Sequence, residues 1–162
     1  MSVILNKFRT LQTNPLSDKE NVRIKVIGRR DRFSSEMLDE ISKVESLTET
    51  HDSFILNVAI GYGGRAEIVD AVKKIGTQIQ ENKLSVDDIN EELLSNHLYT
   101  EGIPDPDLII RTSGEERLSG FLIWQSAYSE LYFSEVFWPA FRKIDFLRAI
   151  RVWQQRHRRF GK

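Results

Sequence analysis

Two kinds of hydrophobic pattern alternate along the chain. Short apolar runs predict strands at Val22–Ile27 and Phe54–Ala59 and a short buried strand at Leu108–Ile110. Between them, apolar residues recur every three or four positions, which is typical of amphipathic helices. We expect helices at residues 2–13 and after the capping box Ser85–Asp88. A helix capped by Ser34 or Ser35 has the apolar stripe Leu38, Ile41, Val44 and Leu47, and a helix after Gly64 has the stripe Ile68, Val69, Val72, Ile75 and Ile79. A final helix over residues 145–156 turns Phe146, Ile150 and Trp153 inward.

Strands that alternate with helices indicate an α/β fold with a mainly parallel sheet flanked by helices. We expect residues 1–162 to form a single domain. Only three or four strands are visible, whereas a sheet usually has about five or six. The sheet therefore looks incomplete, as if strands were missing upstream or were supplied by a partner.

Composition excludes several classes of protein. Hydrophobic residues make up 40% and charged residues 29% of the 162 residues, which is typical of a soluble globular protein. We expect no signal peptide in Met1–Leu5 and no membrane-spanning segment, because no apolar run approaches about 20 residues. There are no cysteines, which allows a cytoplasmic location. The net charge of -1 argues against a nucleic-acid partner.

Two regions near the C-terminus have unusual compositions. Residues 142–162 contain eight Lys or Arg and one acid, Asp145, so they form either a solvated helix face or an anion site. Residues 121–141 contain eight aromatic residues, which belong either to the core or to a subunit interface.

Two loops follow predicted strands, where ligands bind in open parallel sheets. Gly61–Arg65 (GYGGR) lets a ligand approach the backbone next to a helix N-terminus, although it also suits a plain tight turn. Residues 110–119 (IRTSGEERLS) place two arginines and several hydroxyls after a strand. Such groups bind phosphate oxygens, unless the arginines are paired with Glu115 or Glu116.

Glu130 follows this second loop. A carboxylate beside a diphosphate site can hold Mg²⁺. By residue type alone, an ordinary surface or ion-paired glutamate is the plainer interpretation.

Several blocks resemble the cis-prenyltransferases, the undecaprenyl diphosphate synthase family. They are Asp105–Gln125 (DPDLIIRTSGEERLSGFLIWQ) with its extension through Glu130 to Pro139, the block Asn57–Arg65 (NVAIGYGGR), and the C-terminal Arg159-Phe160-Gly161. The resemblance runs from about Val22 to Lys162. It implies an enzyme that condenses isopentenyl diphosphate with an allylic diphosphate, with Mg²⁺ as cofactor.

The resemblance also implies roles for individual residues. Arg111, Arg117 and Ser119 would bind the diphosphate of isopentenyl diphosphate, and Glu130 would help to hold Mg²⁺. Arg65 is a further candidate for substrate binding. In a homodimer, or a heterodimer with a related chain, Arg159 and Gly161 would reach the neighbouring subunit's substrate. A lipid product would allow peripheral association with a membrane.

One departure from the family pattern is large. The N-terminal Asp-Gly-Asn-x-x-Trp block, which carries the Mg²⁺-positioning aspartate, is absent, as are the strand and helices of the allylic pocket. We therefore expect no catalytic aspartate and little or no activity from the isolated chain. The alternatives are a truncated or split enzyme, a non-catalytic partner subunit of a heteromeric enzyme, and an unrelated anion-binding α/β module.

Overall fold

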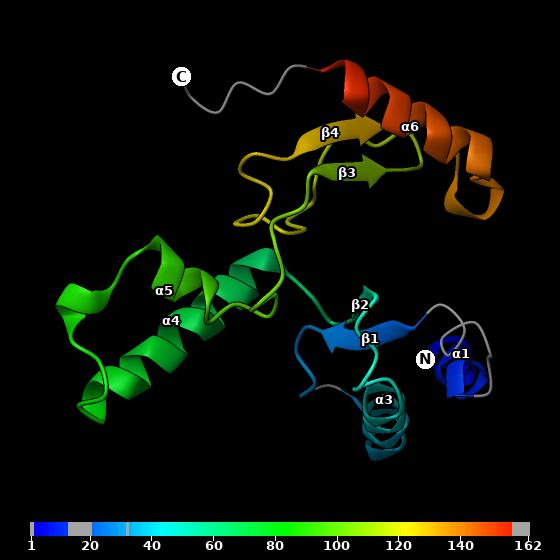
Figure 1. Ribbon diagram of the computed structural model, residues 1–162. Helices are drawn as coiled ribbons and strands as arrows, with labels where there is room; N and C mark the ends of the chain where they lie inside the picture. Colours follow the sequence, from blue (N-terminus) through cyan, green and yellow to red (C-terminus); the bar gives the residue numbers. More distant parts are fainter. Residues whose placement is uncertain (1, 13–20, 32, 157–162) are drawn as a thin grey trace. The chain divides into compact units, whose positions relative to one another are not determined.

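A computed structural model describes residues 2–12, 21–31 and 33–156. The chain divides into two compact units, residues 1–62 and 63–162. Each unit contains one pair of parallel strands, so the predicted parallel α/β architecture is confirmed (Figure 1). Whether the two units act as a single domain stays a prediction.

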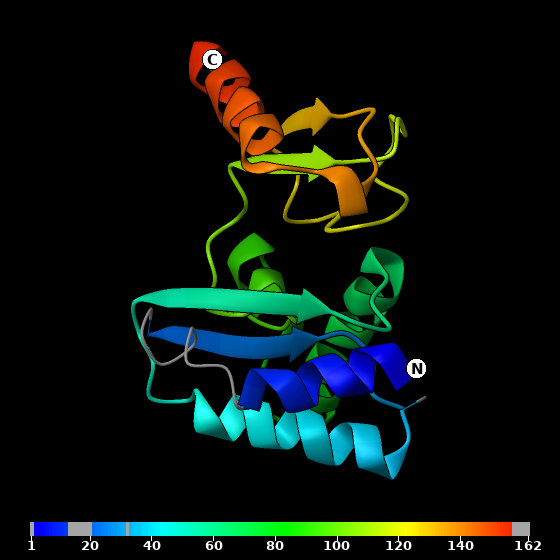
Figure 2. The same cartoon turned by 90° about the vertical axis from the view of Figure 1, so that its right-hand side faces the viewer.

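The N-terminal unit contains α1 (Ser2–Gln12), β1 (Val22–Ile27), α3 (Ser35–Leu47) and β2 (Phe54–Ala59). Both helices lie on the same side of the strand pair (Figure 2). The strands pair residue for residue, from Val22 opposite Phe54 to Ile27 opposite Ala59.

The core of this unit lies between the helices and β1. Ser34 caps α3 by accepting a hydrogen bond from the Met37 amide at 3.3 Å, which fixes the start of the helix. The capped helix buries Ile41 and Val44 of the predicted stripe, whereas Leu47, at the end of that stripe, is 59% exposed. The core residues are Phe8, Ile24, Val26, Met37, Ile41 and Val44.

The first half of β2 is exposed, although its residues are apolar. Phe54, Ile55 and Leu56 are 61%, 47% and 46% exposed. These residues belong to a strand that pairs on one side only, with β1, among the described residues. Their burial would need a neighbouring strand or layer, which an apolar run cannot supply by itself.

The C-terminal unit contains α4 (Gly64–Gln80), the short helix η1 (Val86–Asp88), α5 (Glu91–Ser95), β3 (Leu108–Arg111), β4 (Glu130–Phe133), η2 (Trp138–Ala140) and α6 (Lys143–Gln155). The expected capping box is present, since Asp88 Oδ2 accepts from the Ser85 amide at 2.7 Å. It opens η1 rather than a longer helix, and Asn90 caps α5 separately. Figure 1 shows α6 beside the β3–β4 pair.

The predicted inward faces of two helices were partly wrong. In α4, Val69 and Val72 are about half exposed, whereas Glu67 and Ala71 are buried. In α6, Asp145 and Ala149 are buried, and the predicted inward residue Phe146 is 46% exposed. Both helices bury small or hydrogen-bonded residues, which a hydrophobic stripe does not identify.

The aromatic residues between Phe121 and Phe141 are not core residues in this chain. None of the eight is among the buried hydrophobic residues described, and Tyr128, Phe137 and Trp138 are about 70% exposed. Trp138 stacks on Phe141 with ring centroids 5.8 Å apart. The interpretation as core was therefore wrong, and the interpretation as a subunit interface stays a prediction. Among the described residues, no helix has the length and apolarity needed to cross a membrane.

Candidate functional site: a strand-end loop and an apolar cavity

Three of the six predicted binding residues, Arg111, Arg117 and Ser119, lie at the end of β3 or in the loop after it. Arg111, the last residue of β3, is partly buried. Beyond it, the amide of Ser113 donates to the Val136 carbonyl at 3.0 Å, and the amide of Gly114 donates to the Ser134 carbonyl at 2.9 Å. The loop is thereby held along the segment that follows β4, which keeps its backbone in a defined position.

Three non-glycine residues in this region have left-handed backbone conformations. Ser113, Ser119 and Leu122 have φ values of 74°, 50° and 46°. Such conformations cost about 1–3 kcal/mol each and tend to cluster at binding sites and active sites. Ser119, one of the binding residues predicted from the sequence, is among these strained residues, which supports a functional role for the loop.

Arg117 extends from this loop into solvent. Its guanidinium lies 2.5 Å from the Glu115 carboxylate, and its side chain is 67% exposed. The ion pair with Glu115, which was the alternative to phosphate binding for this arginine, is therefore present. Exposed ion pairs contribute only about 0–1 kcal/mol, so an incoming diphosphate can displace Glu115.

Glu130 is the first residue of β4 and is also paired. Its Oε2 accepts from Nη1 of Arg156 at 2.9 Å, and its side chain is 24% exposed. The described residues contain no group of three or more His, Asp or Glu side chains that could hold a metal. A single carboxylate still fits Mg²⁺, because this ion is often bound by one or two carboxylates together with substrate phosphates.

The register of β3 and β4 sets the distance between Glu130 and the arginine loop. Glu130 lies opposite Leu108, and Arg111 lies opposite Phe133. Three residues of strand span about 10 Å, so Glu130 and Arg111 stand at opposite ends of the parallel pair. If both contact one Mg²⁺-diphosphate, their long side chains must reach toward each other.

The glycine-rich loop Gly61–Arg65 joins β2 to α4. Arg65 lies in the first turn of α4 and is exposed. The N-cap residue of this 17-residue helix is Gly63, which provides no side-chain cap. The first turn of α4 thus combines a positive helix end with a basic side chain, as an anion site requires.

Gly64 explains why this loop is rich in glycine. Its amide donates to the Gly120 carbonyl at 2.9 Å. A Cβ atom at position 64 would lie 2.7 Å from that carbonyl oxygen and 2.9 Å from Cγ1 of Ile123. The start of α4 can therefore approach the loop after β3 only with glycine at this position.

Two features of the N-terminal unit were missed from the sequence. Oδ1 of Asn57 on β2 is buried and has no hydrogen-bond partner among the described residues. Buried amides without partners are rare, which makes Asn57 a candidate site residue. Arg29 and Arg30 follow β1 after Gly28, and the Arg29 amide donates to the Gly61 carbonyl at 3.2 Å. A polar residue inside an apolar strand and two arginines at a strand end were the available signals.

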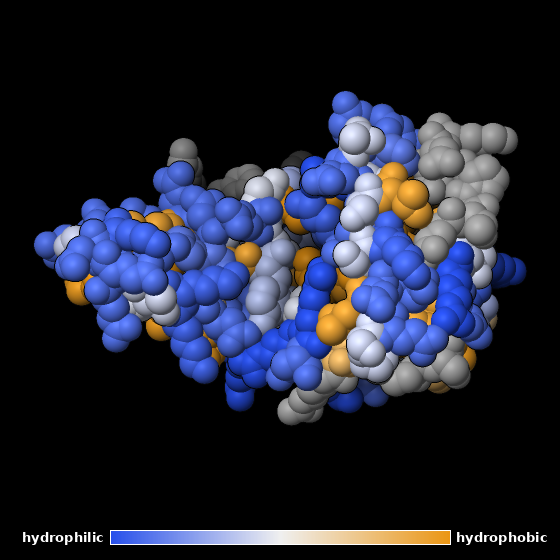
Figure 3. All heavy atoms as spheres, turned by 90° about the horizontal axis from the view of Figure 1, so that it is seen from below, coloured by the Kyte–Doolittle hydropathy of each residue, from blue (hydrophilic) through white to orange (hydrophobic). Residues whose placement is uncertain are grey.

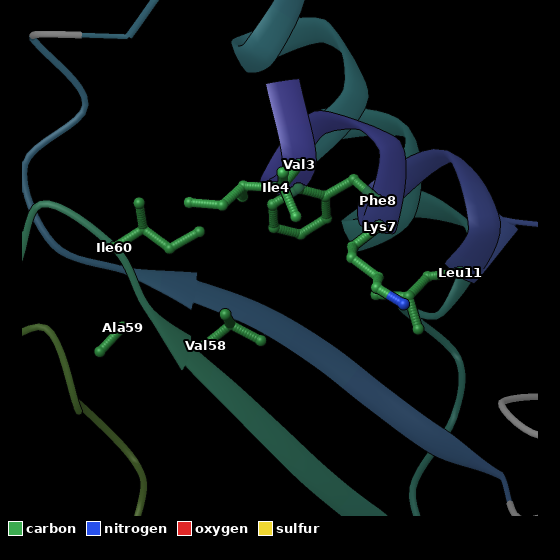
Figure 4. A pocket seen from close by; sticks show the side chains of 8 residues that line it. All are labelled: Val3, Ile4, Lys7, Phe8, Leu11, Val58, Ala59 and Ile60. Atoms are coloured by element: carbon green, nitrogen blue, oxygen red, sulfur yellow. The ribbon is translucent and has the colours of Figure 1, made fainter. Parts of the chain in front are cut away.

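An apolar cavity of about 360 Å³ lies between α1 and the end of β2 (Figure 4). Its wall is hydrocarbon except for Lys7, whose amine can extend toward water. Such a lining suits a hydrocarbon chain. The lining residues are Val3, Ile4, Lys7, Phe8, Leu11, Val58, Ala59 and Ile60.

Two predicted residues, Arg159 and Gly161, lie outside the described residues. In the structure Arg111 ends β3, and Ser119 lies eight residues further along the chain. The structure places Glu130 at the other end of the strand pair.

Comparison with known proteins agrees with these features. The family model described as "Putative undecaprenyl diphosphate synthase" matches residues 1–161. An isoprenyl transferase from Thermus thermophilus is 56% identical over 166 residues, covering 100% of this chain and 63% of the relative. A tritrans,polycis-undecaprenyl-diphosphate synthase (geranylgeranyl-diphosphate specific) from Picrophilus torridus is 56% identical over 160 residues, covering 99% of this chain and 63% of the relative.

A solved structure supports the same assignment. Lavandulyl diphosphate synthase from Lavandula x intermedia, in complex with dimethylallyl diphosphate, has a TM-score of 0.91 and 32% identity, covering 98% of this chain and 70% of that one. The fold is that of the prenyltransferases in this comparison. The chain belongs to the undecaprenyl diphosphate synthase family. It spans 63% of the length of these two relatives.

Proposed function

We propose that this chain is the larger part of a cis-prenyltransferase that condenses isopentenyl diphosphate with an allylic diphosphate. The observation that carries the proposal is the end of β3 and the loop after it, which hold two arginines and the strained Ser119 in a chain of this family. Arg111, Arg117 and Ser119 bind the diphosphate of isopentenyl diphosphate. Arginine forks and hydroxyl groups suit phosphate oxygens in both geometry and charge.

The metal would be Mg²⁺, with Glu130 as its ligand from this part of the chain. When bound, Mg²⁺ neutralises charge on the diphosphate leaving group. Arg65, at the positive end of α4, provides a second cation for a diphosphate. These residues lower the free-energy cost of separating the diphosphate from the allylic carbon.

The assembly would be a homodimer or a heterodimer with a related chain. The exposed aromatic residues Tyr128, Phe137 and Trp138 support this proposal, because aromatic side chains are enriched at interfaces. Arg159 and Gly161 reach the partner's isopentenyl diphosphate. The protein works in the cytoplasm and meets the membrane through its lipid product.

Catalysis would require residues that this sequence does not contain. No Asp-Gly-Asn-x-x-Trp block occurs in the 162 residues, so the chain alone has little or no transferase activity. A preceding segment or a partner chain supplies the missing aspartate.

The test is calorimetric titration of isopentenyl diphosphate with Mg²⁺. We expect binding by the chain, loss of binding in Arg111→Ala, and unchanged binding in Arg151→Ala, which removes an exposed arginine of α6. Equal affinity in Arg111→Ala and the unsubstituted chain would overturn the assignment of the diphosphate site.

A second candidate is a non-catalytic partner subunit, which the missing aspartate block favours. Labelled isopentenyl diphosphate distinguishes the two when the chain is mixed with a catalytically complete relative. If this chain is the partner, Arg111→Ala leaves product formation by the mixture unchanged. If it contributes a working substrate site, the same variant lowers product formation.

A further inference from the structure

The two strands of the N-terminal unit differ in their hydrophobic pattern. β1 (VRIKVI) alternates apolar and basic residues at its start, which is typical of a strand with one solvated face, whereas β2 (FILNVA) is apolar except for Asn57. A nearly continuous apolar run is typical of a strand that lies inside a sheet and is covered on both faces. Among the residues that the structure describes, however, β2 pairs with β1 alone. The strand with the pattern of a central strand therefore lies at an edge.

Side chains occupy the outer edge of β1. The Ile24 amide donates to Oγ1 of Thr48 at 3.0 Å. The Val26 amide donates to Oε1 of Glu45 at 2.9 Å, and the Val26 carbonyl accepts from Nη2 of Arg30 at 3.0 Å. Because these backbone groups already have partners, β1 is protected from pairing with a further strand on this side. A further strand can therefore be added only beyond β2.

The outer edge of β2 is open, in contrast to that of β1. The amide of Ile60, directly after β2, donates to the Ile27 carbonyl at 3.0 Å, so the even-numbered residues of β2 turn their backbone groups toward β1. These directions alternate along a strand, so Ile55, Asn57 and Ala59 turn their amides and carbonyls to the opposite edge. These amides and carbonyls make no hydrogen bond to any residue of the described ranges. Another extended segment offers donors and acceptors at the spacing of this row.

The side chains along the open edge are also uncovered. Leu56 is 46% exposed, whereas Ile24, its partner in the register of β1, is 2% exposed. Figure 2 shows the reason, since α1 and α3 lie on the side of β1 and leave β2 uncovered. The six residues of β2 include no charged residue and no proline, which are the residues that protect the edges of natural sheets. An added strand would therefore bury apolar side chains and pair the open backbone at the same time.

We propose that the open edge of β2 receives a strand from the upstream part of a cis-prenyltransferase, the part that this chain lacks. The chain covers 63% of the Thermus thermophilus relative, so more than a third of that relative lies outside the match. The missing Asp-Gly-Asn-x-x-Trp block belongs to this upstream part. Strand addition obtains its affinity from backbone hydrogen bonds and its specificity from alternate side chains. The identity of the donor rests on the proposed function, whereas the open edge rests on the hydrogen bonds of β1 and β2.

Amide hydrogen exchange of the chain alone, followed by NMR, tests the open edge. We expect the amides of Ile55, Asn57 and Ala59 to exchange at least about ten-fold faster than those of Leu56 and Val58, which face β1. Equal exchange of the two sets would overturn the proposal. Protection of the first set that rises with the concentration of the chain would also overturn it, because the edge would then pair with a second copy.

The donor is tested by co-expressing this chain with the segment of the Thermus thermophilus relative that precedes the match. We expect the two polypeptides to co-purify. Exchange at Ile55, Asn57 and Ala59 should slow at least about ten-fold in the complex, while Leu56 and Val58 keep the protection that they have in the chain alone. Co-purification without this change, or failure to form a complex, would contradict the proposal.

Two matched variants test whether the contact lies at this edge. Ile55 and Ile89 are 47% and 49% exposed, so the chain alone should fold with lysine at either position, which circular dichroism checks. Ile55→Lys should weaken binding of the donor at least about ten-fold, since a lysine on an edge strand opposes pairing. Ile89→Lys should not change it, because Ile89 lies two residues before α5, and the surface over α4 and α5, at the left of Figure 3, is predominantly hydrophilic. Equal weakening by the two variants would overturn the proposal.

Titration of the same complex with isopentenyl diphosphate separates this inference from the proposed function. Protected amides on β2 without isopentenyl diphosphate binding would support the added strand and contradict the diphosphate site. Binding of isopentenyl diphosphate without protection on β2 would contradict the added strand and leave the diphosphate site supported.

Discussion

Arg156 joins the end of α6 to the start of β4. From Nη1 it donates to Oε2 of Glu130 at 2.9 Å and to the Leu131 carbonyl at 2.8 Å. The carboxylate proposed to hold Mg²⁺ is thus already paired with a cation of the same chain.

Removing that guanidinium should free Glu130 for the metal. We expect Arg156→Ala to raise the Mg²⁺ affinity of the isopentenyl diphosphate complex about two- to five-fold, because an ion pair of up to about 1 kcal/mol no longer competes. Calorimetric Mg²⁺ titration measures the change, and Arg151→Ala on the same helix is the control. Lower affinity in Arg156→Ala would mean that Arg156 positions Glu130 instead of competing for it.

The buried carboxylate of Glu67 should stabilise the C-terminal unit. It is 1% exposed and accepts hydrogen bonds from the Tyr99 amide at 2.9 Å and from Nε2 of Gln125. Glu67→Ala leaves these donors unpaired, so we expect a loss of about 3 kcal/mol in the free energy of unfolding. Urea denaturation tests this, and Glu101→Ala, at an exposed acid, should change stability by less than about 0.5 kcal/mol.

Two glycines of α4 should respond to alanine with opposite signs. Gly64→Ala places a Cβ atom against the Gly120 carbonyl oxygen at 2.7 Å, so we expect lower stability and a displaced loop after β3. A Cβ atom at position 76 would meet no neighbouring atom within 4 Å, and Gly76→Ala should stabilise the helix by about 0.5–1 kcal/mol. Thermal unfolding of the two variants gives the comparison. Equal effects would show that the approach to Gly120 is not needed.

Asp145 should make α6 sensitive to acid. The Arg142 amide donates to its Oδ2 at 3.0 Å, and together with the charges of Arg142 and Arg148 this holds the pKa of Asp145 below its ordinary value of 3.8. A carboxylate whose pKa is lower in the folded than in the unfolded state stabilises the fold at pH values above its unfolded-state pKa. This stabilisation is lost as the pH falls through the folded-state pKa.

The matching variant is Asp145→Asn, which cannot titrate. We expect it to be less stable than the unsubstituted chain at pH 6, with the gap narrowing below pH about 3.8 as Asp145 becomes protonated. Urea midpoints across this range measure the gap, with Asp31→Asn at an exposed position as the control. A gap that does not change with pH would contradict the assigned role.

Local signals in the sequence located most elements correctly. Val22–Ile27 and Phe54–Ala59 form strands with the expected bounds, and Ser34 caps α3 as expected. These features depend on neighbours a few positions away, which the sequence states directly. The strand Glu130–Phe133 was missed, because four residues within an aromatic-rich segment carry no distinct period.

The site was located less completely. The arginines and serines of the loop after β3 could be chosen because their residue types and the family signature coincide. The pairing of Glu130 with Arg156 joins residues 26 positions apart, and the orphaned Oδ1 of Asn57 depends on packing. Neither the ion pair nor the unpaired oxygen produces a periodic pattern in the sequence.

The sequence by itself determined the family, the parallel α/β class and the identity of the diphosphate-binding candidates, because motifs and short-range hydrophobic periods are written in consecutive residues. Only the tertiary structure decided which faces are buried. It placed Glu67 and Asp145 inside and left Phe137 and Trp138 outside. Burial depends on the elements that pack against a face, and a buried carboxylate is stable only where donors from distant segments meet it.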